Sequence, residues 1–322
     1  MAKILVTGGA GFIGSHLCER LIRDGHEVTA FDNFATGRVS NLSNLSGLAR
    51  FTFVEGSILD ARVLNSLVDK AEYVFHLAAA VGVFNIVNNP LASLLTNIRG
   101  TENVLEAALN TMTPVFLTSS SEVYGKNISD SLKESDDRIL GSPTTLRWSY
   151  SEAKAIDESL AYAYFVEKQL QTRIVRFFNT VGPRQLGAYG MVVPRFIEAA
   201  LSNKPITIYG DGKQTRCFAH VYDVVDAVMA IAFADNTIGK VINIGNDFEV
   251  SIYDLAKKII KETSSKSEII YIPYAEAYGD GFEDMERRVP NIDLINQLVG
   301  WAPKRDLSTM IADVSSEMKA NF

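Results

Sequence analysis

The chain contains 322 residues, of which 47% are hydrophobic and 21% charged. That length predicts one large domain with a smaller appended lobe, and the composition excludes an intrinsically disordered protein. The net charge of -7 disfavours nucleic acid and anionic membranes as partners, since both select for basic surfaces. We therefore expect a globular protein that binds neither nucleic acid nor a membrane.

Short apolar runs alternate with longer helical patterns through the first half of the chain. We predict strands over residues 3–7, 27–32, 50–56, 73–80, 114–120 and 172–179. Helices are predicted from residue 12, after residue 60, over roughly Leu91 to Asn110 and over Ser151 to Lys168. Strands separated by helices form parallel βαβ units, and continuous apolar strands are typical of a sheet covered on both faces. The sequence therefore predicts an α/β fold with a Rossmann-type doubly wound parallel sheet.

Beyond Gly182 the pattern becomes less regular, and the tail from about Tyr278 to Pro303 is interrupted by Pro and Gly. We interpret this part as a smaller carboxyl-terminal lobe that binds substrate at the carboxyl ends of the strands. The predicted division is 1–180 for the Rossmann domain and 181–322 for the lobe. A further strand and helix from about 215–245 are expected to join the first domain.

The segment TGGAGFIG follows the first strand and opens the first helix, which is the context that a dinucleotide-binding turn requires. Its glycines are Gly8 or Gly9, then Gly11 and Gly14. They allow a tight turn, close approach to a pyrophosphate and packing of helix on strand. Asp32 ends the second strand, where a carboxylate accepts hydrogen bonds from a ribose diol and repels a 2′-phosphate. The sequence therefore favours NAD over NADP.

Tyr150 and Lys154 lie four residues apart in YSEAK, so they project from one side of a helix. A lysine ammonium beside a phenol favours the phenolate and lowers the tyrosine pKa from about 10 toward the working pH. Such a phenol is a general base for oxidation of an alcohol beside a nicotinamide. Without further support, however, this spacing is typical of a solvated helix face.

Further support comes from SSSEVYG, which follows a predicted strand and lies where open α/β sheets bind ligands. A serine there can hydrogen-bond a reacting hydroxyl, and Glu122 can handle a second proton. A purely structural role as a turn cap is reasonable for Ser119 and poor for Ser121. His76 is expected to be a structural histidine, since no second ligand-type residue is suitably spaced for a metal. We predict no metal site.

Six segments, taken in chain order, resemble the extended short-chain dehydrogenase/reductase family that modifies nucleotide sugars: TGGAGFIG, HLAA, SSSEVYG, YSEAK, RFFNTVGPR and YGDGKQTRCFAHVYDVVDA. The resemblance implies that Tyr150 is the base, that Lys154 orients the nicotinamide ribose and that Ser121 contacts the sugar 4-hydroxyl. It also implies that Asn179 and Arg216 hold the nucleotide diphosphate. Ser57 departs from the pattern, because relatives commonly carry an aspartate there that contacts adenine.

Two sets of binding residues follow for this chain. The predicted NAD contacts are Gly8, Gly11, Phe12, Ile13, Gly14, Asp32, Asn33, Ser57, Ile58, Leu77, Ala78, Ala79, Tyr150, Lys154, Phe177 and Val181. The predicted substrate contacts are Ser120, Ser121, Asn179, Val193, Thr207, Tyr209, Gln214, Arg216 and Arg288. The segment ITIYGDG resembles relatives that bind uridine, which favours a UDP-sugar.

Members of this family oxidise the sugar at C4, and three reactions remain open from the resulting ketone. A carboxylate at C5 is lost as carbon dioxide, a hydroxymethyl group leads to 4,6-dehydration, and return of the hydride alone gives a 4-epimer. The order Ser121, Glu122 resembles UDP-glucuronate decarboxylases, although GDP-mannose-type dehydratases share it. LRWSYSEAK and AYGDGFEDMERRVPNIDLINQLVGW also resemble decarboxylases, and the second places Arg288 near the sugar carboxylate. Alternatively, Arg288 grips the pyrophosphate, as in epimerases.

We favour a UDP-glucuronate decarboxylase, with Tyr150, Lys154, Ser121, Glu122 and Arg288 as catalytic residues. The alternatives are a nucleotide-sugar 4-epimerase, a 4,6-dehydratase and, more remotely, a dinucleotide-binding module without catalysis. The resemblance also implies a homodimer that pairs the helix over Ser151 to Lys168 with the one before it, although burial within one chain would explain their apolar faces. Cys18 and Cys217 have no paired spacing, which favours reduced thiols and a cytoplasmic location.

Overall fold

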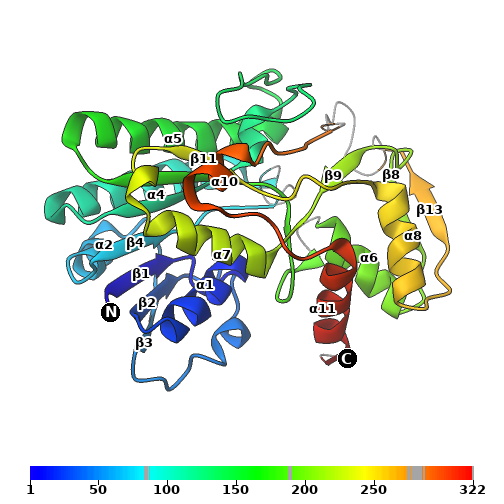
Figure 1. The fold of residues 1–322 in the computed structure, drawn as a ribbon, viewed down its shortest axis with the longest axis horizontal. Helices are drawn as coiled ribbons and strands as arrows, with labels where there is room; N and C mark the ends of the chain where they lie inside the picture. The colour runs from blue at the N-terminus through cyan, green and yellow to red at the C-terminus, as the bar shows by residue number, and fades with distance from the viewer. Residues whose placement is uncertain are drawn as a thin grey trace.

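The computed structural model describes residues 1–82, 86, 88–187, 191–273, 276, 285 and 287–320. A seven-stranded parallel sheet in the order β11-β6-β5-β4-β1-β2-β3 forms its centre (Figure 1). Its strands are β1 (Lys3–Thr7), β2 (Glu27–Asp32), β3 (Phe51–Glu55), β4 (Tyr73–His76), β5 (Val115–Ser120), β6 (Thr172–Phe177) and β11 (Val241–Ile244). The predicted Rossmann-type sheet is confirmed, and its carboxyl edge collects the segments that follow each strand.

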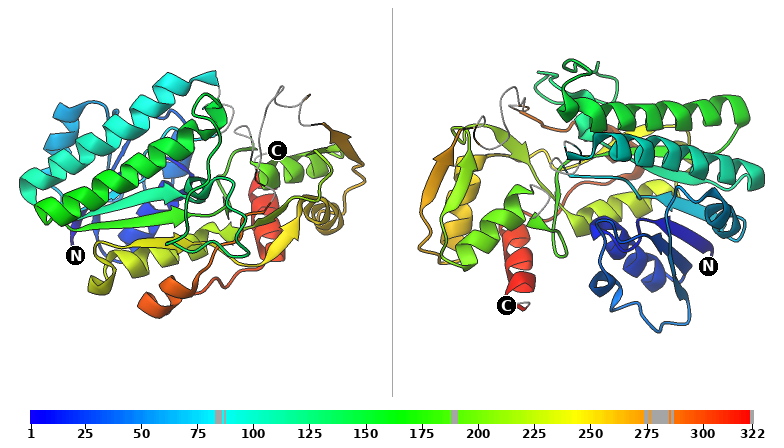
Figure 2. Two further views of the ribbon diagram at one scale, coloured as in Figure 1. Left: turned by 90° about the horizontal axis from the view of Figure 1, so that it is seen from above. Right: turned by 180° about the vertical axis from the view of Figure 1, so that it is seen from behind.

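Helices cover both faces of this sheet, which explains why its strands are apolar without alternation. One face carries α2 (Ala61–Val68), α4 (Pro90–Thr111) and α5 (Ser149–Lys168), and α4 and α5 lie side by side (Figure 2). The other face carries α1 (Phe12–Arg23), α7 (Val221–Ala232) and α10 (Asp293–Val299). Each layer has its own buried apolar cluster, with Phe31 and Val104 in the first and Leu17 and Val228 in the second.

The strand β11 and the helix α7 come from the region around 215–245 but belong to the large lobe. Val241 to Ile244 pair in parallel with Ile174 to Phe177 of β6. Helix α7 packs beside α1 on the same face of the sheet (Figure 1). The Asp223 side chain of α7 accepts hydrogen bonds from the backbone N–H groups of Lys304 and Arg305. Late segments of the chain thus complete the sheet and its outer layer.

The smaller lobe has a separate core between three helices, α6 (Val192–Leu201), α8 (Ile252–Glu262) and α11 (Leu307–Ala320). Two pairs of short strands border it, β8 (Ile206–Tyr209) with β13 (Ile269–Ile272), and β9 (Thr215–Cys217) with β12 (Glu249–Ser251). The pair β7 (Thr180–Val181) and β10 (Ala219–His220) lies where the chain passes between the lobes. Part of the predicted tail, residues 277–284 and 286, lies outside the described residues.

None of the described helices is both long and apolar enough to cross a membrane. Two short 3-10 helices matter for the site, η2 (Ser121–Tyr124) and η3 (Leu146–Trp148), and a further one, η1 (Val39–Leu42), lies between β2 and β3. The first continues directly from β5, and the second leads directly into α5. Both therefore lie at the carboxyl edge of the sheet.

Candidate active site

A cavity of about 690 Å³ lies at the carboxyl ends of the strands and extends to the small lobe. Its volume is within the range of about 300–1,000 Å³ that is usual for ligand sites. All the predicted NAD contacts line it, and so do all the predicted substrate contacts except Thr207. Thr207 is not among the described residues that line the cavity; it is half-buried in β8, and its carbonyl oxygen accepts a hydrogen bond from Arg195.

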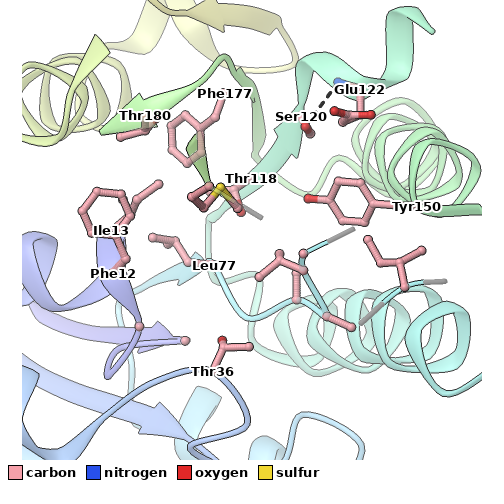
Figure 3. A pocket seen from close by; sticks show the side chains of 18 of the residues that line it. Phe12, Ile13, Thr36, Leu77, Thr118, Ser120, Glu122, Tyr150, Phe177 and Thr180 are labelled. Carbon is pink, nitrogen blue, oxygen red and sulfur yellow. Dashed lines mark hydrogen bonds between the residues drawn. The ribbon is translucent and has the colours of Figure 1, made fainter. Parts of the chain in front are cut away.

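The glycine turn between β1 and α1 can only be formed without side chains. Gly8 has φ of +73°, and a Cβ atom there would lie 2.7 Å from the backbone nitrogen of Ala78. A Cβ atom on Gly14 would lie 2.1 Å from the carbonyl oxygen of Gly8. The turn therefore leaves the start of α1, with Phe12 and Ile13, open to the cavity (Figure 3). Backbone N–H groups at such a helix start bind a pyrophosphate.

Asp32 lies at the end of β2, on the edge of the same cavity. Its carboxylate accepts hydrogen bonds from the backbone N–H groups of Ala10 at 3.0 Å and Phe34 at 2.8 Å. These bonds fix the carboxylate where a ribose diol is recognised in dinucleotide sites. Ser57 also lines the cavity, and its hydroxyl accepts a hydrogen bond from Leu59 N–H at 3.2 Å. The glycine turn and the carboxylate together fit NAD.

Tyr150 projects from the first turn of α5 into the cavity (Figure 3). Lys154, one turn further along, is buried, and its ammonium donates hydrogen bonds to the Thr118 carbonyl oxygen and to the Asp157 carboxylate, both at 3.0 Å. The carboxylate of Asp157 also shares a hydrogen bond with Thr101. Lys154 is thus held in one place and kept protonated by a buried anion.

The expected lowering of the Tyr150 pKa does not hold for the protein alone. Desolvation inside the cavity raises the pKa of Tyr150, and the carboxylates of Glu122 and Asp157 raise it further. The Lys154 ammonium lowers this pKa, as expected, and so does a hydrogen bond with Ser120, but together they are outweighed. The prediction considered the cation alone and missed, above all, the desolvation of the phenol, and then the nearby carboxylates of Glu122 and Asp157.

The three serines after β5 have different surroundings. The Ser119 hydroxyl donates to Glu158 at 2.5 Å, which makes it structural, as the sequence suggested. The Ser120 hydroxyl accepts a hydrogen bond from the backbone N–H of Glu122 at 3.2 Å, which Figure 3 marks, and it also lowers the pKa of Tyr150. Ser121 is buried at the start of η2 and lines the cavity. Ser120 is thus the serine that acts on Tyr150, and the contact between Ser121 and the sugar 4-hydroxyl, which the resemblance implies, stays a prediction.

Glu122 lies between two arginines that come from distant parts of the chain. Arg147 in η3 contacts one carboxylate oxygen at 2.7 Å, and Arg288 contacts the other at 2.5 Å. The Glu122 side chain is 14% exposed, and those of Arg147 and Arg288 are 7% and 9% exposed. The guanidinium of Arg147 also lies over the ring of the buried Trp148. The cluster carries one positive charge in excess and lines the cavity.

This geometry holds Glu122 as an anion. Burial alone opposes its ionisation, but the charges and hydrogen bonds of Arg147 and Arg288 prevail and lower its pKa to about 2. The effect is large because opposite charges at this distance interact strongly where water is excluded. Glu122 therefore enters the reaction as a carboxylate, and it is not a proton donor in the resting protein.

The other predicted substrate residues lie on the side of the small lobe. Asn179 donates to the Cys217 carbonyl oxygen at 3.0 Å and accepts from Arg288 at 2.6 Å, so it holds that arginine in place. Val193, Tyr209, Gln214 and Arg216 line the cavity. Of the described residues that line it, five are basic and two are acidic, which favours an anionic ligand.

His76 has the structural role that the sequence predicted. Its ring is hydrogen-bonded to Thr7 at 2.7 Å and to Thr101 at 3.2 Å, and it is not among the described residues that line the cavity. Burial lowers the pKa of His76 to about 3, so the ring is neutral. Cys18 and Cys217 are free and buried, as expected.

Two residues of the site were not predicted. Arg147 was part of the segment LRWSYSEAK that resembled decarboxylases, and an arginine three residues before the catalytic tyrosine at the start of a helix is a signal that could have identified it. Asp157 follows Lys154 by three residues, which is the spacing of an ion pair on a helix, although burial cannot be deduced from that spacing.

The comparisons with known proteins agree with this geometry. The sequence model of the NAD dependent epimerase/dehydratase family matches residues 4–245. UDP-N-acetyl-alpha-D-glucosaminuronate decarboxylase of Bacillus cytotoxicus is 41% identical over 302 residues, which cover 94% of this chain and 92% of that protein. UDP-glucuronic acid decarboxylase 1 of Xenopus tropicalis is 36% identical over 94% of this chain and 68% of that protein.

Among solved structures, UDP-glucuronic acid 4-epimerase of Bacillus cereus, in complex with UDP-glucuronic acid and NAD, superposes with a TM-score of 0.89. It is 30% identical, and the match covers 99% of this chain and 100% of that one. The match to the family's sequence model includes the glycine turn, the serines at the end of β5 and the helix with Tyr150 and Lys154, because all of these lie within residues 4–245. The chain belongs to the NAD-dependent epimerase/dehydratase family.

Proposed function

We propose that this protein is an NAD-dependent decarboxylase of a UDP-linked sugar acid. The observation that carries the proposal is the Arg147–Glu122–Arg288 cluster, which places two guanidinium groups and one carboxylate beside the catalytic tyrosine. The excess positive charge is complementary to a sugar carboxylate. The curated relatives that match most of the chain include decarboxylases of UDP-glucuronate and of its N-acetylated counterpart, which supports the same reading.

The reaction begins at the C4 hydroxyl of the sugar. Tyr150 accepts the hydroxyl proton, Ser120 hydrogen-bonds the reacting oxygen, and Lys154 stabilises the phenolate and contacts the nicotinamide ribose. When bound, NAD supplies the hydride acceptor at C4 and, in its oxidised form, a positive charge that favours the phenolate. The outcome is a ketone next to the carbon that bears the carboxylate.

The carboxylate group leaves in the second stage. The bond between C5 and the carboxylate carbon breaks, carbon dioxide departs, and the electron pair passes to the C4 oxygen as an enolate. A proton from solvent then adds to C5 and restores the ketone. Glu122 is already ionised, so it repels the substrate carboxylate while Arg147 and Arg288 orient it. Loss of a neutral molecule relieves this repulsion. Return of the hydride to C4 would then give the UDP-pentose.

The decisive experiment is incubation with UDP-glucuronate, UDP-N-acetylglucosaminuronate and UDP-glucose plus NAD, followed by mass spectrometry of the nucleotide sugars. Loss of the mass of carbon dioxide from either acid, with no change in UDP-glucose, supports the proposal. An unchanged mass with a new epimer indicates a 4-epimerase, which is the activity named for several of the structural neighbours. Loss of water indicates a dehydratase, and binding of NAD without turnover indicates a non-catalytic module.

Arg147 provides a test of how the carboxylate is recognised. Arg147→Met is expected to raise KM for the sugar acid by about 10–100-fold, since one charge-assisted contact to a carboxylate contributes roughly 1.5–3 kcal/mol. Affinity for NAD should stay unchanged, and Arg147→Lys should recover part of the loss. Arg23→Met, at an exposed arginine of α1, serves as the control. An unaltered KM in Arg147→Met would remove this residue from substrate recognition.

We also propose that the protein is a homodimer that pairs α4 and α5 with their counterparts, and that it works in the cytoplasm. Exposed apolar side chains on these two helices support the dimer, namely Leu91, Ile156, Tyr162 and Val166. An isologous contact of four helices would cover them. The double variant Ile156→Glu/Val166→Glu should shift the mass in light scattering from two chains to one, whereas Val39→Glu, at an exposed residue of η1, should not. A wild-type monomer would contradict the proposal.

A further inference from the structure

Asn243, on β11, connects two parts of the site although it lies outside the cavity. It is fully buried at 0% exposure and is not among the described residues that line the cavity. Its backbone N–H donates to the Glu134 carboxylate at 2.8 Å, so the residue is fixed at both main chain and side chain. The amide side chain makes one accepted and two donated hydrogen bonds, and these bonds reach three separate segments.

The accepted bond leads to Glu122. The Tyr124 hydroxyl donates to Asn243 Oδ1 at 2.8 Å, and Tyr124 lies two residues after Glu122 in the same 3-10 helix, η2. The other side of this buried phenol ring is covered by the Arg176 guanidinium, 4.8 Å from the ring centre. The hydroxyl bond to Asn243 therefore sets how far η2 extends from the end of β5, and with it the position of the Glu122 carboxylate.

The donated bonds lead to Arg288. Asn243 Nδ2 donates to the carbonyl oxygens of Leu132 at 2.9 Å and Asn291 at 3.3 Å. Leu132 in turn forms two backbone hydrogen bonds, from its N–H to the Val289 carbonyl oxygen and from Asn291 N–H to its own carbonyl oxygen, both at 2.8 Å. These bonds pair Leu132 with residues 289–291, which directly follow Arg288 in the chain. The amide of Asn243 holds this segment against the large lobe.

We propose that Asn243 is a positioning residue that sets the distance between Glu122 and Arg288, and thereby controls the carbon dioxide release step in particular. This inference rests on the proposed decarboxylase function. A buried amide suits the task, because it alone among uncharged side chains accepts one bond and donates two in fixed directions. Lys154 is held by other groups, the Thr118 carbonyl oxygen and Asp157, so a change at Asn243 should slow C4 oxidation less than carbon dioxide release.

Two variants test separately the hydrogen bonds that lead from Asn243 to Glu122 and those that lead to Arg288. Asn243→Asp keeps the acceptor for Tyr124 but removes both donated bonds, which releases the Arg288 segment. Tyr124→Phe removes only the hydroxyl bond, which releases the Glu122 side. Asn236→Asp is the control, since the amide of Asn236 also donates to a backbone carbonyl oxygen, that of Leu298 at 2.9 Å, but is exposed and is not among the described residues that line the cavity. Unfolding temperature and NAD affinity are measured for all three variants.

Single-turnover reactions with the sugar acid would follow NADH absorbance for C4 oxidation and labelled carbon dioxide for the second step. Asn243→Asp and Tyr124→Phe should slow carbon dioxide release by about tenfold or more relative to oxidation, and should increase the carboxyl-carbon isotope effect. A purely structural role would slow both steps equally and would overturn the inference, as would two variants with wild-type ratios. If wild-type protein releases no carbon dioxide, the proposed function itself fails. Should Asn243→Asp not fold, Tyr124→Phe decides the question.

Discussion

Replacing Tyr150 with phenylalanine is expected to lower turnover by about 10³-fold, within the range of about 10²–10⁴ that a positioned acid or base contributes. The phenol is the group that takes the C4 hydroxyl proton, and phenylalanine fills the same space without an ionisable oxygen. Affinity for NAD should change little, because the other predicted cofactor contacts, among them the glycine turn and Asp32, are left intact. Steady-state turnover and NAD binding by fluorescence titration check this expectation.

Tyr162→Phe is the matched control, since Tyr162 lies on the same helix and is exposed. It should turn over at the wild-type rate. The pH profile gives a second readout. The pKa of Tyr150 is raised by desolvation, so activity should increase with pH as the phenol loses its proton, and this acidic limb should vanish in Tyr150→Phe. Full activity of Tyr150→Phe would invalidate every step proposed above.

The change Glu122→Gln is expected to abolish most of the carbon dioxide release, by about 10²–10³-fold, while C4 oxidation continues and NADH accumulates. Glutamine has the shape of glutamate but no charge, so the two arginines lose the anion that bridges them, and the substrate carboxylate is no longer repelled. Single-turnover measurement of NADH and carbon dioxide distinguishes the two steps.

Stability must be measured in the same variant, because removing one partner of a buried ion pair costs about 3–5 kcal/mol. Glu152→Gln provides the control, since Glu152 forms an exposed ion pair with Arg138. The Glu122 pKa of about 2 lies below the ordinary value, so the stability that this ion pair contributes is present above the unfolded pKa and is lost as the pH falls through about 2. A wild-type rate of carbon dioxide release in Glu122→Gln would deny this carboxylate any part in the chemistry.

Most of the large lobe could be predicted from the sequence, because its strands and helices are local and strongly patterned. The strand over Lys3–Thr7 and the helix from Phe12 were predicted at their observed positions, since the glycines between them leave few alternatives. The path of the segments around Arg288 was not predictable. Their positions depend on hydrogen bonds between residues more than a hundred apart in the chain, such as Asn243 to Leu132, which no local pattern encodes.

In the site, too, the features that depend on local sequence were predictable and those that depend on long-range packing were not. Tyr150 and Lys154 were identified because their spacing on one helix is a local property. The choice between Ser120 and Ser121 was not settled by the sequence, since it depends on the residue at which β5 passes into η2. Three consecutive serines give no signal of that point. The raised pKa of Tyr150 likewise depends on Asp157, whose burial results from the packing of α5 on α4 and the sheet.

The position of β11 at the edge of the sheet determines when the protein can fold during synthesis. A nascent chain that has left the ribosome only as far as β6 has an open parallel edge, and the apolar side of α1 still lacks α7. The helix layer is completed only after Ala232 has emerged, and the sheet edge only after Ile244 has emerged. At that point α8, β13 and α11 of the small lobe still have to be made. The Rossmann half is therefore not a separable cofactor-binding module, and a fragment cut after β6 would need a chaperone to stay in solution.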